Sequence, residues 1–380
     1  MKLAIISHTP HYKNKNNSEI TGWGPTVREI NHMTELFEEI YHIAPLHIGK
    51  SPASSMAYES DHIKFIPLNP YGGEKLSDKI SIITTAAGNL KIIKDILKLV
   101  DWVQFRAPTA MGIYVLPYLS LLNKPKRWVK YAGNWKMENP PLSYSFQKWW
   151  LNNNFQHSKV TINGQWEGQK KHILNFQNPC LDNEELSRAK KIAVTKNFEG
   201  KLTLCFVGTL TENKGVHLLL EALKKIKNPE DINEVLLIGD GEEKKKYEAI
   251  AKEINLKIIF KGLLKRNELE EIYKASHLII LPSESEGFPK VIAEASAYGC
   301  VPIVSDVSSV GQYYNDMNGF LLKKTDVETL VQKINSALSD RINLKKMSAQ
   351  CIKVAELFTF ENYIKNLKEK ILCNDNIDKI

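Results

Sequence analysis

The chain has 380 residues, of which 43% are hydrophobic and 25% are charged. This composition is typical of a soluble globular protein and argues against a disordered chain. The length exceeds one comfortable hydrophobic core and favours two domains of ordinary size. The net charge of +8 lies in residues 1–180, which hold 21 Lys and Arg against 13 Asp and Glu, whereas residues 181–380 hold 30 of each.

The chain begins with a short apolar run that ends at Ser7 and His8. This run is too brief for the core of a signal peptide, and it predicts a first buried strand. The most apolar later stretch, residues 113–122, is about half as long as a membrane span and contains Pro117. Five scattered cysteines without metal-type spacing fit a reducing compartment. We therefore expect a cytoplasmic protein with no transmembrane helix.

Short apolar runs alternate with longer helical patterns almost throughout, which is typical of βα units and parallel sheets. In the second half each run is followed by a turn residue and a helical pattern, as where Gly208 follows Val207. This predicts an α/β doubly wound domain, whose ligand lies beyond the carboxyl ends of the strands. The predicted strands are residues 3–7, 39–44, 63–67, 102–105, 128–131, 202–207, 234–238, 257–260, 277–281 and 302–304.

The predicted boundaries follow from composition. Residues 181–200 are polar, charged and without a clean period, so we place the linker there. The first domain is then residues 1–180 and the second is residues 201–357. Apolar side chains at helical spacing predict a terminal helix over about 358–373, which is a candidate to pack back on the first domain.

The most informative stretch runs from Leu281 to Gly299. It predicts a strand end, a loop with Glu286, and a helix that begins near Phe288 and carries Glu294. A helix start directs unpaired N–H groups and a positive dipole end at the loop, which makes a phosphate site. The plain alternative is an acidic residue that complements the dipole, followed by an ordinary exposed helical glutamate.

A second strand-turn-helix unit spans residues 206–215 and places Lys214 at a helix start. A lysine there opposes the helix dipole. An anionic ligand such as a diphosphate would resolve the conflict, although a solvated lysine would also tolerate it.

With these motifs the sequence resembles the retaining glycosyltransferases of the GT-B fold, in particular the group with bacterial lipopolysaccharide and capsule transferases (glycosyltransferase family 4, or glycosyl transferases group 1). The resemblance covers residues 200–325, and a weaker match lies at residues 22–26. It implies two Rossmann-like domains that face one another across a cleft, with the acceptor in the first. The motifs that carry it are Glu286-x7-Glu294, Gly287-Phe-Pro, Gly208-Thr-Leu-x3-Lys214-Gly, Gly239-Asp-Gly, Phe260-Lys-Gly262 and Gly299-Cys-Val-Pro-Ile-Val.

The resemblance also implies roles for individual residues. Glu286 would bind the donor sugar beside the reacting carbon, and Glu294 would accept hydrogen bonds from the ribose hydroxyls. Lys214 would neutralise the departing diphosphate. The remaining donor-binding candidates are Gly22, Gly24, Gly208, Thr209, Gly262, Leu263 and the segment Gly287, Phe288, Pro289, Lys290 and Val291.

One position departs from the family pattern. Thr209 stands where the family usually has an arginine that neutralises the diphosphate together with the lysine. Lys290 and Arg106 are the two candidates to supply the missing cation, and Arg106 and Asn134 are candidates for the acceptor side. Many family members also have a histidine that faces the donor sugar; His8 and His11 are the alternatives here, and we assign neither.

The expected reaction is retaining transfer of a sugar from a nucleotide-sugar donor to a glycan or lipid-linked acceptor, in bacterial surface polysaccharide synthesis. The sequence has no Asp-x-Asp triplet, so we expect neither a metal nor another cofactor; nor do we expect nucleic acid as a partner. The alternatives are a sugar-nucleotide epimerase or phosphorylase on the same fold, and a non-catalytic nucleotide- or carbohydrate-binding protein.

The basic first half carries one further interpretation. Its excess charge, with Trp149 and Trp150 beside Lys148, suits peripheral contact with the inner, anionic face of a membrane. The plain alternatives are that lysines solubilise the surface and that the two indoles pack in the core.

Overall fold

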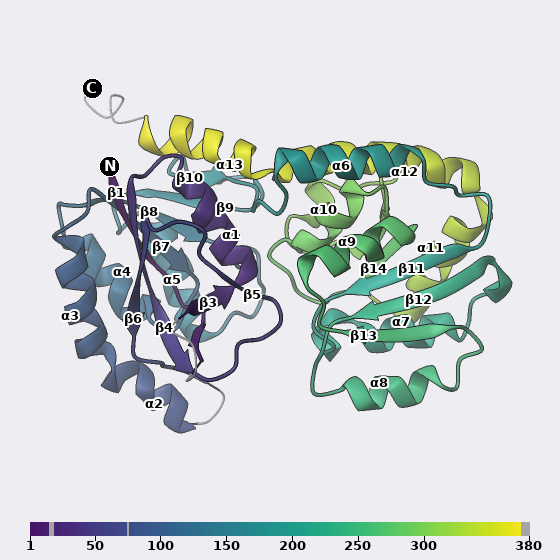
Figure 1. Cartoon of the computed structure of the whole chain (residues 1–380), viewed down its shortest axis with the longest axis horizontal. Helices are drawn as coiled ribbons and strands as arrows, with labels where there is room; N and C mark the ends of the chain where they lie inside the picture. Colours follow the sequence, from purple (N-terminus) through teal and green to yellow (C-terminus); the bar gives the residue numbers. More distant parts are fainter. Residues whose placement is uncertain (15–18, 74–75, 374–380) are drawn as a thin grey trace. The chain divides into compact units, whose positions relative to one another are not determined.

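A computed structural model describes residues 1–14, 19–73 and 76–373 of the chain, with only the backbone at residues 76–78. The chain divides into two compact units. Unit 1 comprises residues 1–177 together with the C-terminal segment from Tyr363, and unit 2 comprises residues 178–362. Both units combine a mostly parallel sheet with helices on its two faces (Figure 1). The α/β doubly wound fold predicted from the sequence is therefore confirmed.

In its described part, unit 1 contains a sheet of ten strands, in the order β10-β9-β8-β7-β1-β4-β2-β3-β5, with β6 also paired to β4. Its central strand β1 has four consecutive residues, from Leu3 to Ile6, with no exposed surface, as expected for a strand covered on both faces. The strands are β1 Lys2–Ile6, β2 His11–Lys13, β3 Ile20–Trp23, β4 Glu39–Ile48, β5 Ser55–Ala57, β6 Ile63–Leu68, β7 Trp102–Ala107, β8 Lys126–Tyr131, β9 Lys159–Ile162 and β10 Ile173–Asn175.

Two apolar clusters cover the faces of this sheet. One joins the strands to the helices α3, α4 and α5, and the other joins them to α1 and the C-terminal segment. Tyr363, Ile364, Leu367 and Ile371 belong to the second cluster, so the terminal helix packs in unit 1. The helices are α1 Gly24–Met33, α2 Leu76–Thr84, α3 Ala86–Leu97, α4 Gly112–Ser120, α5 Leu142–Asn152 and α13 Phe360–Asn366, which continues as a π-helical segment Leu367–Leu372.

Unit 2 contains a fully parallel sheet in the order β13-β12-β11-β14-β15-β16. Helices α6, α9, α10 and α12 lie over one face, and α7, α8 and α11 lie over the other (Figure 1). The strands are β11 Leu202–Val207, β12 Ile232–Ile238, β13 Ile258–Gly262, β14 Leu278–Leu281, β15 Val301–Ser305 and β16 Phe320–Leu322. The helices are α6 Asn183–Val194, α7 Val216–Leu223, α8 Lys244–Ala251, α9 Arg266–Ala275, α10 Lys290–Ala297, α11 Val327–Ser339 and α12 Arg341–Ala355.

The segment 181–200 differs from the predicted linker, because most of it forms α6 within unit 2. Asp182 accepts a hydrogen bond from the backbone N–H of Glu185, and Glu185 accepts one from the backbone N–H of Asp182, which makes a capping box. Leu186 and Ala189 then enter the core of unit 2 at helical spacing. Ile192 packs against the same core one turn further along the helix, although the polar remainder of the helix hides this period in the sequence.

Candidate active site

The order of the strands in unit 2 reverses between β11 and β14, which are neighbours in the sheet but not in the sequence. Ligands of doubly wound folds bind outside the carboxyl ends of the strands at such a point. The segments that follow these two strands are residues 208–215 and 282–289, and they are joined by a hydrogen bond from the N–H of Glu284 to the carbonyl of Asn213 (2.9 Å). Seven of the predicted donor-site residues lie in these two segments.

Lys214 and Glu286 meet across this point. The ammonium of Lys214 lies 2.5 Å from a carboxylate oxygen of Glu286, and the two side chains are 25% and 11% exposed. The pair joins residues 72 positions apart in the sequence. A lysine that would otherwise oppose a helix dipole is thus held by a carboxylate, with part of both groups open to a ligand.

The two segments pack so closely that one glycine is required. Gly215 has φ +72°, and a Cβ at this position would lie 2.1 Å from the carbonyl oxygen of Pro282. Only glycine allows both this left-handed backbone and this approach. Gly215 therefore fixes how Lys214 stands relative to Glu286.

The segment after β12 packs on the one after β11. A Cβ on Gly239 would lie 1.8 Å from the carbonyl oxygen of Gly208, and the N–H of Leu210 donates to the carbonyl of Asp240 (3.0 Å). Thr209 lies between these contacts and is exposed. Next in the sheet, the carbonyl of Gly262 accepts from the N–H of Gly239 (2.9 Å), and the neighbouring Leu263 is half exposed. Gly208, Thr209, Gly262 and Leu263 thus lie at the carboxyl ends of the strands, as do Lys214 and Glu286.

Helix α10 begins at Lys290, two residues later than the sequence predicts. Phe288 is buried and its ring stacks on that of Phe358 at 4.2 Å between centroids, so its side chain is part of the core. Pro289 occupies the N-cap position, and the first helical hydrogen bond from this turn comes from Ile292 N–H. A phosphate beyond the carboxyl ends of the strands would therefore contact the backbone of Gly287 to Val291 rather than the apolar side chains of this segment.

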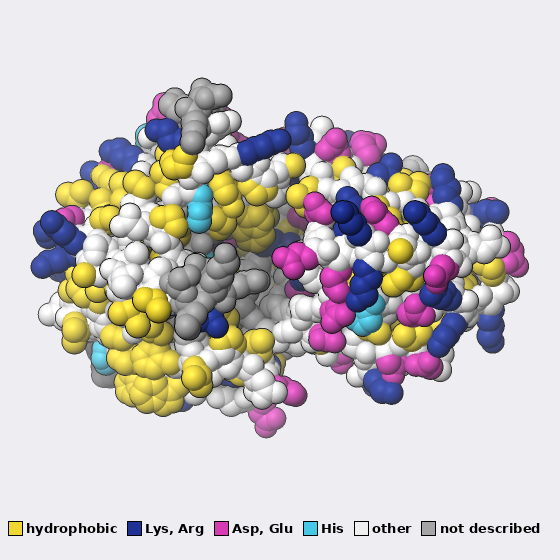
Figure 2. Space-filling model, turned by 90° about the horizontal axis from the view of Figure 1, so that it is seen from below, with side chains coloured by type: hydrophobic (Ala, Val, Ile, Leu, Met, Phe, Trp, Pro, Cys, Tyr) yellow, Lys and Arg dark blue, Asp and Glu magenta, His cyan; other side chains and the backbone are white. Residues whose placement is uncertain are grey.

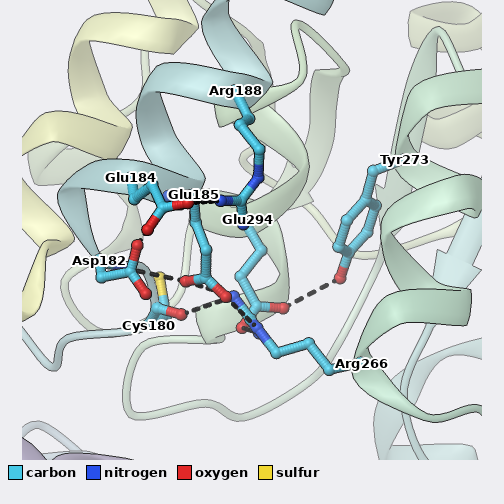
Figure 3. Close-up of polar contacts among 8 residues, drawn as sticks. All are labelled: Cys180, Asp182, Glu184, Glu185, Arg188, Arg266, Tyr273 and Glu294. Atoms are coloured by element: carbon cyan, nitrogen blue, oxygen red, sulfur yellow. Dashed lines mark hydrogen bonds and ion pairs between the residues drawn. The ribbon is translucent and has the colours of Figure 1, made fainter.

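Glu294 lies on α10 inside a polar cluster rather than on an exposed helix face (Figure 3). One carboxylate oxygen accepts from Arg266 (3.0 Å), and the other accepts from the hydroxyl of Tyr273 (3.1 Å). Burial, and then the charge of Glu294, raise the pKa of the Tyr273 hydroxyl well above its ordinary value, so the phenol stays protonated and donates. The plain alternative of a solvated helical glutamate is therefore excluded by the structure.

Arg266 is the cation of this cluster, and the sequence analysis did not single it out. Its guanidinium also contacts Glu185 at 2.7 and 3.2 Å and the carbonyl of Cys180 at 2.9 Å. Burial acts to lower the pKa of Arg266, but the charges of Glu294 and Glu185 outweigh it and raise the pKa above its ordinary value. Arg266 is the first residue of α9, where a cation opposes the helix dipole, so the argument used for Lys214 could have found it.

Arg106 of unit 1 is engaged within that unit. Its guanidinium lies 2.9 Å from Glu29, and the ammonium of Lys130 lies 2.6 Å from the same carboxylate. The three charged side chains are nearly fully buried. Arg106 therefore has a structural partner, and it could bind a phosphate only by giving up its ion pair with Glu29. Asn134 accepts a hydrogen bond from the backbone N–H of Lys136 (2.9 Å), so part of its role is to shape the turn after β8.

Packing within unit 1 explains why positions 22 and 24 are glycines, without close approach to a donor. A Cβ on Gly22 would lie 2.2 Å from Nε2 of His11, and one on Gly24 would lie 2.6 Å from the carbonyl oxygen of Ser54. Both glycines therefore let strands β2, β3 and β5 pack together, which the sequence analysis did not foresee.

His11 is buried and belongs to a chain of hydrogen bonds, whereas His8 is exposed after β1. Nδ1 of His11 lies 2.9 Å from the carbonyl oxygen of Thr9, which can only accept, so this nitrogen carries the proton. Nε2 then accepts from Tyr58 (2.8 Å), Tyr58 accepts from Nδ1 of His42 (2.5 Å), and Nε2 of His42 accepts from Ser7 (2.7 Å). Burial lowers the pKa of His11 to about 4 and that of His42 well below its ordinary value, so both rings are neutral.

Two features are absent from the part of the chain that the structure describes. No group of three or more His, Cys, Asp or Glu side chains in the described part of the chain is arranged to hold a metal ion. Among the helices described, none is long and apolar enough to cross a membrane.

Comparison with known proteins finds similarity mainly in the second unit. Residues 187–357 match the family described as glycosyl transferases group 1. The chain is 30% identical over 182 residues to the UDP-Gal:alpha-D-GlcNAc-diphosphoundecaprenol alpha-1,3-galactosyltransferase of Escherichia coli, covering 46% of this chain and 44% of the relative. It is 25% identical over 185 residues to the lipopolysaccharide 1,2-N-acetylglucosaminetransferase of Salmonella typhimurium, covering 46% and 49%. The match thus spans about half the length of these relatives.

A solved structure extends the likeness to the whole fold. The Anabaena protein Alr3699/HepE in complex with UDP superposes with a TM-score of 0.69 over 97% of this chain and 99% of that one, at 16% identity. Residues 187–357 are therefore similar to the glycosyl transferases group 1 family, and the two units have the Rossmann-like architecture of the GT-B fold.

Proposed function

We propose that this protein transfers a sugar, with retention of its anomeric configuration, from a UDP-sugar to a glycan or lipid-linked acceptor in bacterial surface polysaccharide synthesis. The observation that carries the proposal is the meeting of Lys214 and Glu286 at the point where the strand order of unit 2 reverses. UDP is chosen because the Anabaena structure holds it and the Escherichia coli relative is named for UDP-Gal.

The charges at this point suit departure of a nucleoside diphosphate. Negative charge builds on the leaving phosphate as the bond to the anomeric carbon breaks, and groups already in place stabilise it best. Lys214 supplies one ammonium, and the backbone at the start of α10 supplies N–H groups and the positive dipole end. Since Lys214 is already held by Glu286, it can serve the phosphate while Glu286 turns its remaining oxygen to a sugar hydroxyl.

Glu294 is proposed to bind the ribose. A carboxylate can accept about four hydrogen bonds, and the described structure uses one on each oxygen of Glu294. Arg266 and Tyr273 thus fix the orientation of the carboxylate and leave it capacity for two hydroxyls. This proposal requires no metal and no other cofactor.

The nucleotide site is tested by titration of the purified chain with UDP. Lys214→Ala is expected to raise the Kd at least tenfold, since a charge-assisted contact contributes about 1.5–3 kcal/mol. Lys246→Ala is the matched control, because Lys246 is an exposed lysine of the same unit that also pairs with carboxylates, those of Glu212 and Glu243. Absence of UDP binding by the wild type, or equal affinities for all three proteins, would reject the site.

Retention is tested on the product. The anomeric carbon of the product should have the same configuration as the donor, as read from the one-bond coupling between that carbon and its hydrogen in an NMR spectrum. An inverted product would reject this part of the proposal and leave the nucleotide site standing.

Contact with an anionic membrane is proposed for unit 1. The visible face of unit 1 is rich in hydrophobic side chains, whereas that of unit 2 has many more charged side chains of both signs (Figure 2). On α2, Ile80 and Ile83 are 53% and 74% exposed, and Lys79 on the same helix is exposed as well. Apolar and basic side chains together suit a membrane interface. Co-sedimentation with anionic vesicles should exceed that with neutral vesicles at low salt and fall at high salt, and equal binding to both would reject the contact.

A further inference from the structure

An open pocket of about 520 Å³ lies within unit 1, beyond the carboxyl ends of β8 and β9. Three tryptophans line it, and they come from three separate segments of the chain. Trp135 follows β8, Trp149 lies on α5, and Trp166 follows β9. The volume lies in the range of small-molecule sites, and the carboxyl end of a parallel sheet is where such sites form.

The walls of the pocket are held in place by contacts outside it. The ring of Trp135 meets Tyr131 edge-on at 4.9 Å, and that of Trp149 meets Phe155 at 5.0 Å between centroids. The loop that carries Trp166 is closed by Gln169, which accepts from the N–H of Trp166 (3.1 Å) and donates to the carbonyl of Ile173 (2.8 Å). Trp149 nevertheless remains 53% exposed, which is unusual for an indole.

Charged groups line the same pocket without pairing among themselves. Lys136 and Lys148 line it together with Glu138 and Glu167, and within the described residues neither lysine forms an ion pair with either glutamate. Burial, and then the charge of Lys136, lower the pKa of Lys148, so nothing near it compensates its charge fully. Both donors and acceptors are thus available to a ligand.

We infer that this pocket binds a saccharide, and that it holds the sugar ring of the acceptor in the proposed transfer. One face of a pyranose ring presents C–H groups, which are attracted to the electron-rich face of an indole. Its hydroxyls both donate and accept, which matches carboxylates and ammonium groups at the rim of an aromatic surface. This inference rests on the proposed function only for the role of the saccharide as acceptor; the pocket and its chemistry belong to unit 1 alone.

The structure also accounts for the double tryptophan of the sequence. Trp150 is partly buried, and its indole N–H donates to the hydroxyl of Ser120 (3.1 Å), so it packs within unit 1. Its neighbour Trp149 projects instead into the pocket wall, and Lys148 lies beside it there. A ligand pocket therefore explains why only one of the two adjacent indoles is exposed.

The test is binding of the full chain to a printed array of bacterial surface saccharides, both neutral and phosphorylated. We expect retention of a defined subset by the wild type and at least a tenfold loss of affinity for that subset in Trp166→Ala and in Lys148→Ala. Trp23→Ala is the matched control, because Trp23 is a similarly exposed indole of unit 1 that does not line the pocket.

UDP affinity, measured on the same proteins, separates the two proposals. Unchanged UDP affinity in the variants shows that unit 2 is intact, and an unchanged unfolding transition of unit 1 assigns the loss on the array to the pocket. Failure of the wild type to retain any saccharide, or retention that Trp166→Ala and Lys148→Ala leave unchanged, overturns the inference. Saccharide binding without UDP binding would reject the proposed function and leave the pocket standing.

Discussion

Replacement of Arg266 by methionine should destabilise unit 2 more than any change to its surface charges. The side chain donates to Glu185, to Glu294 and to the carbonyl of Cys180. Methionine keeps the length and apolar stem but leaves two nearly buried carboxylates facing one another without a cation. Removing one partner of a buried ion pair costs about 3–5 kcal/mol, and since 27% of the Arg266 side chain is exposed we expect the lower end, about 3 kcal/mol.

Urea unfolding, followed by circular dichroism, measures this change. With an m-value of about 3 kcal/mol/M, the midpoint of the unit 2 transition should fall by about 1 M. Arg188→Met is the matched control, since Arg188 pairs with Glu184 on the exposed side of the neighbouring helix α6 (Figure 3), and it should change stability by less than about 0.5 kcal/mol. Glu294→Gln should restore part of the loss in the Arg266→Met background. A midpoint for Arg266→Met equal to that of Arg188→Met would refute this reasoning.

Three further predictions follow from particular contacts. Gly215→Ala should lower UDP affinity and stability, because its Cβ would meet the Pro282 carbonyl oxygen at 2.1 Å. Gly72→Ala, with a similar φ and Ile82 at 4.0 Å as the nearest neighbour, should show only the backbone cost, and equal losses in the two variants would contradict this. Unit 1 should have its full stability above pH 6.5, and its free energy of unfolding should fall by up to about 3 kcal/mol as the pH drops to about 4. The reason is that His11 takes up a proton near pH 6.5 in the unfolded chain, whereas its pKa in the folded chain is about 4. A His11→Asn variant whose free energy of unfolding depends on pH in the same way would argue against this cause. Lys290→Ala should lower the transfer rate at least tenfold. Adding Thr209→Arg to this variant should restore much of the rate if both side chains bind the same phosphate. Wild-type kinetics for Lys290→Ala would leave Lys214 as the lysine that binds the diphosphate.

The sequence predicted the strands that form the centre of both sheets, because each is a short apolar run buried on both faces. All ten predicted strands are present, and Leu202–Val207 has the predicted bounds. Strands β2 and β5 were not predicted, since three residues with mixed side chains carry no period. The pairing of these strands joins His11 to β4 and Gly22 to β5. These partners lie far apart along the chain, so the sequence alone does not indicate that they meet.

The candidate site was predicted in part. Lys214 and Glu286 were singled out separately, from a cation that opposes a dipole and an acid before a helix, and the strand order then brought them together. The dipole argument could have singled out Arg266, but its contact with Glu294 could not be predicted, because Arg266 and Tyr273 reach Glu294 from α9 and Glu185 reaches Arg266 from α6. The pocket with three tryptophans was not predicted for the same reason, because its three indoles come from separate segments of the chain that are brought together only by the fold of unit 1.

The central claim is that Glu286 acts on the donor sugar while the nucleotide is held by other groups. It is tested most directly by measuring, on Glu286→Gln, both the rate of sugar transfer from the UDP-sugar and the Kd for UDP. The account predicts that transfer is nearly abolished while the Kd for UDP stays close to that of the wild type, because the amide keeps the size of the side chain but loses the charge beside the reacting carbon. Loss of UDP affinity in proportion to loss of transfer would contradict the placement of Glu286 at the sugar.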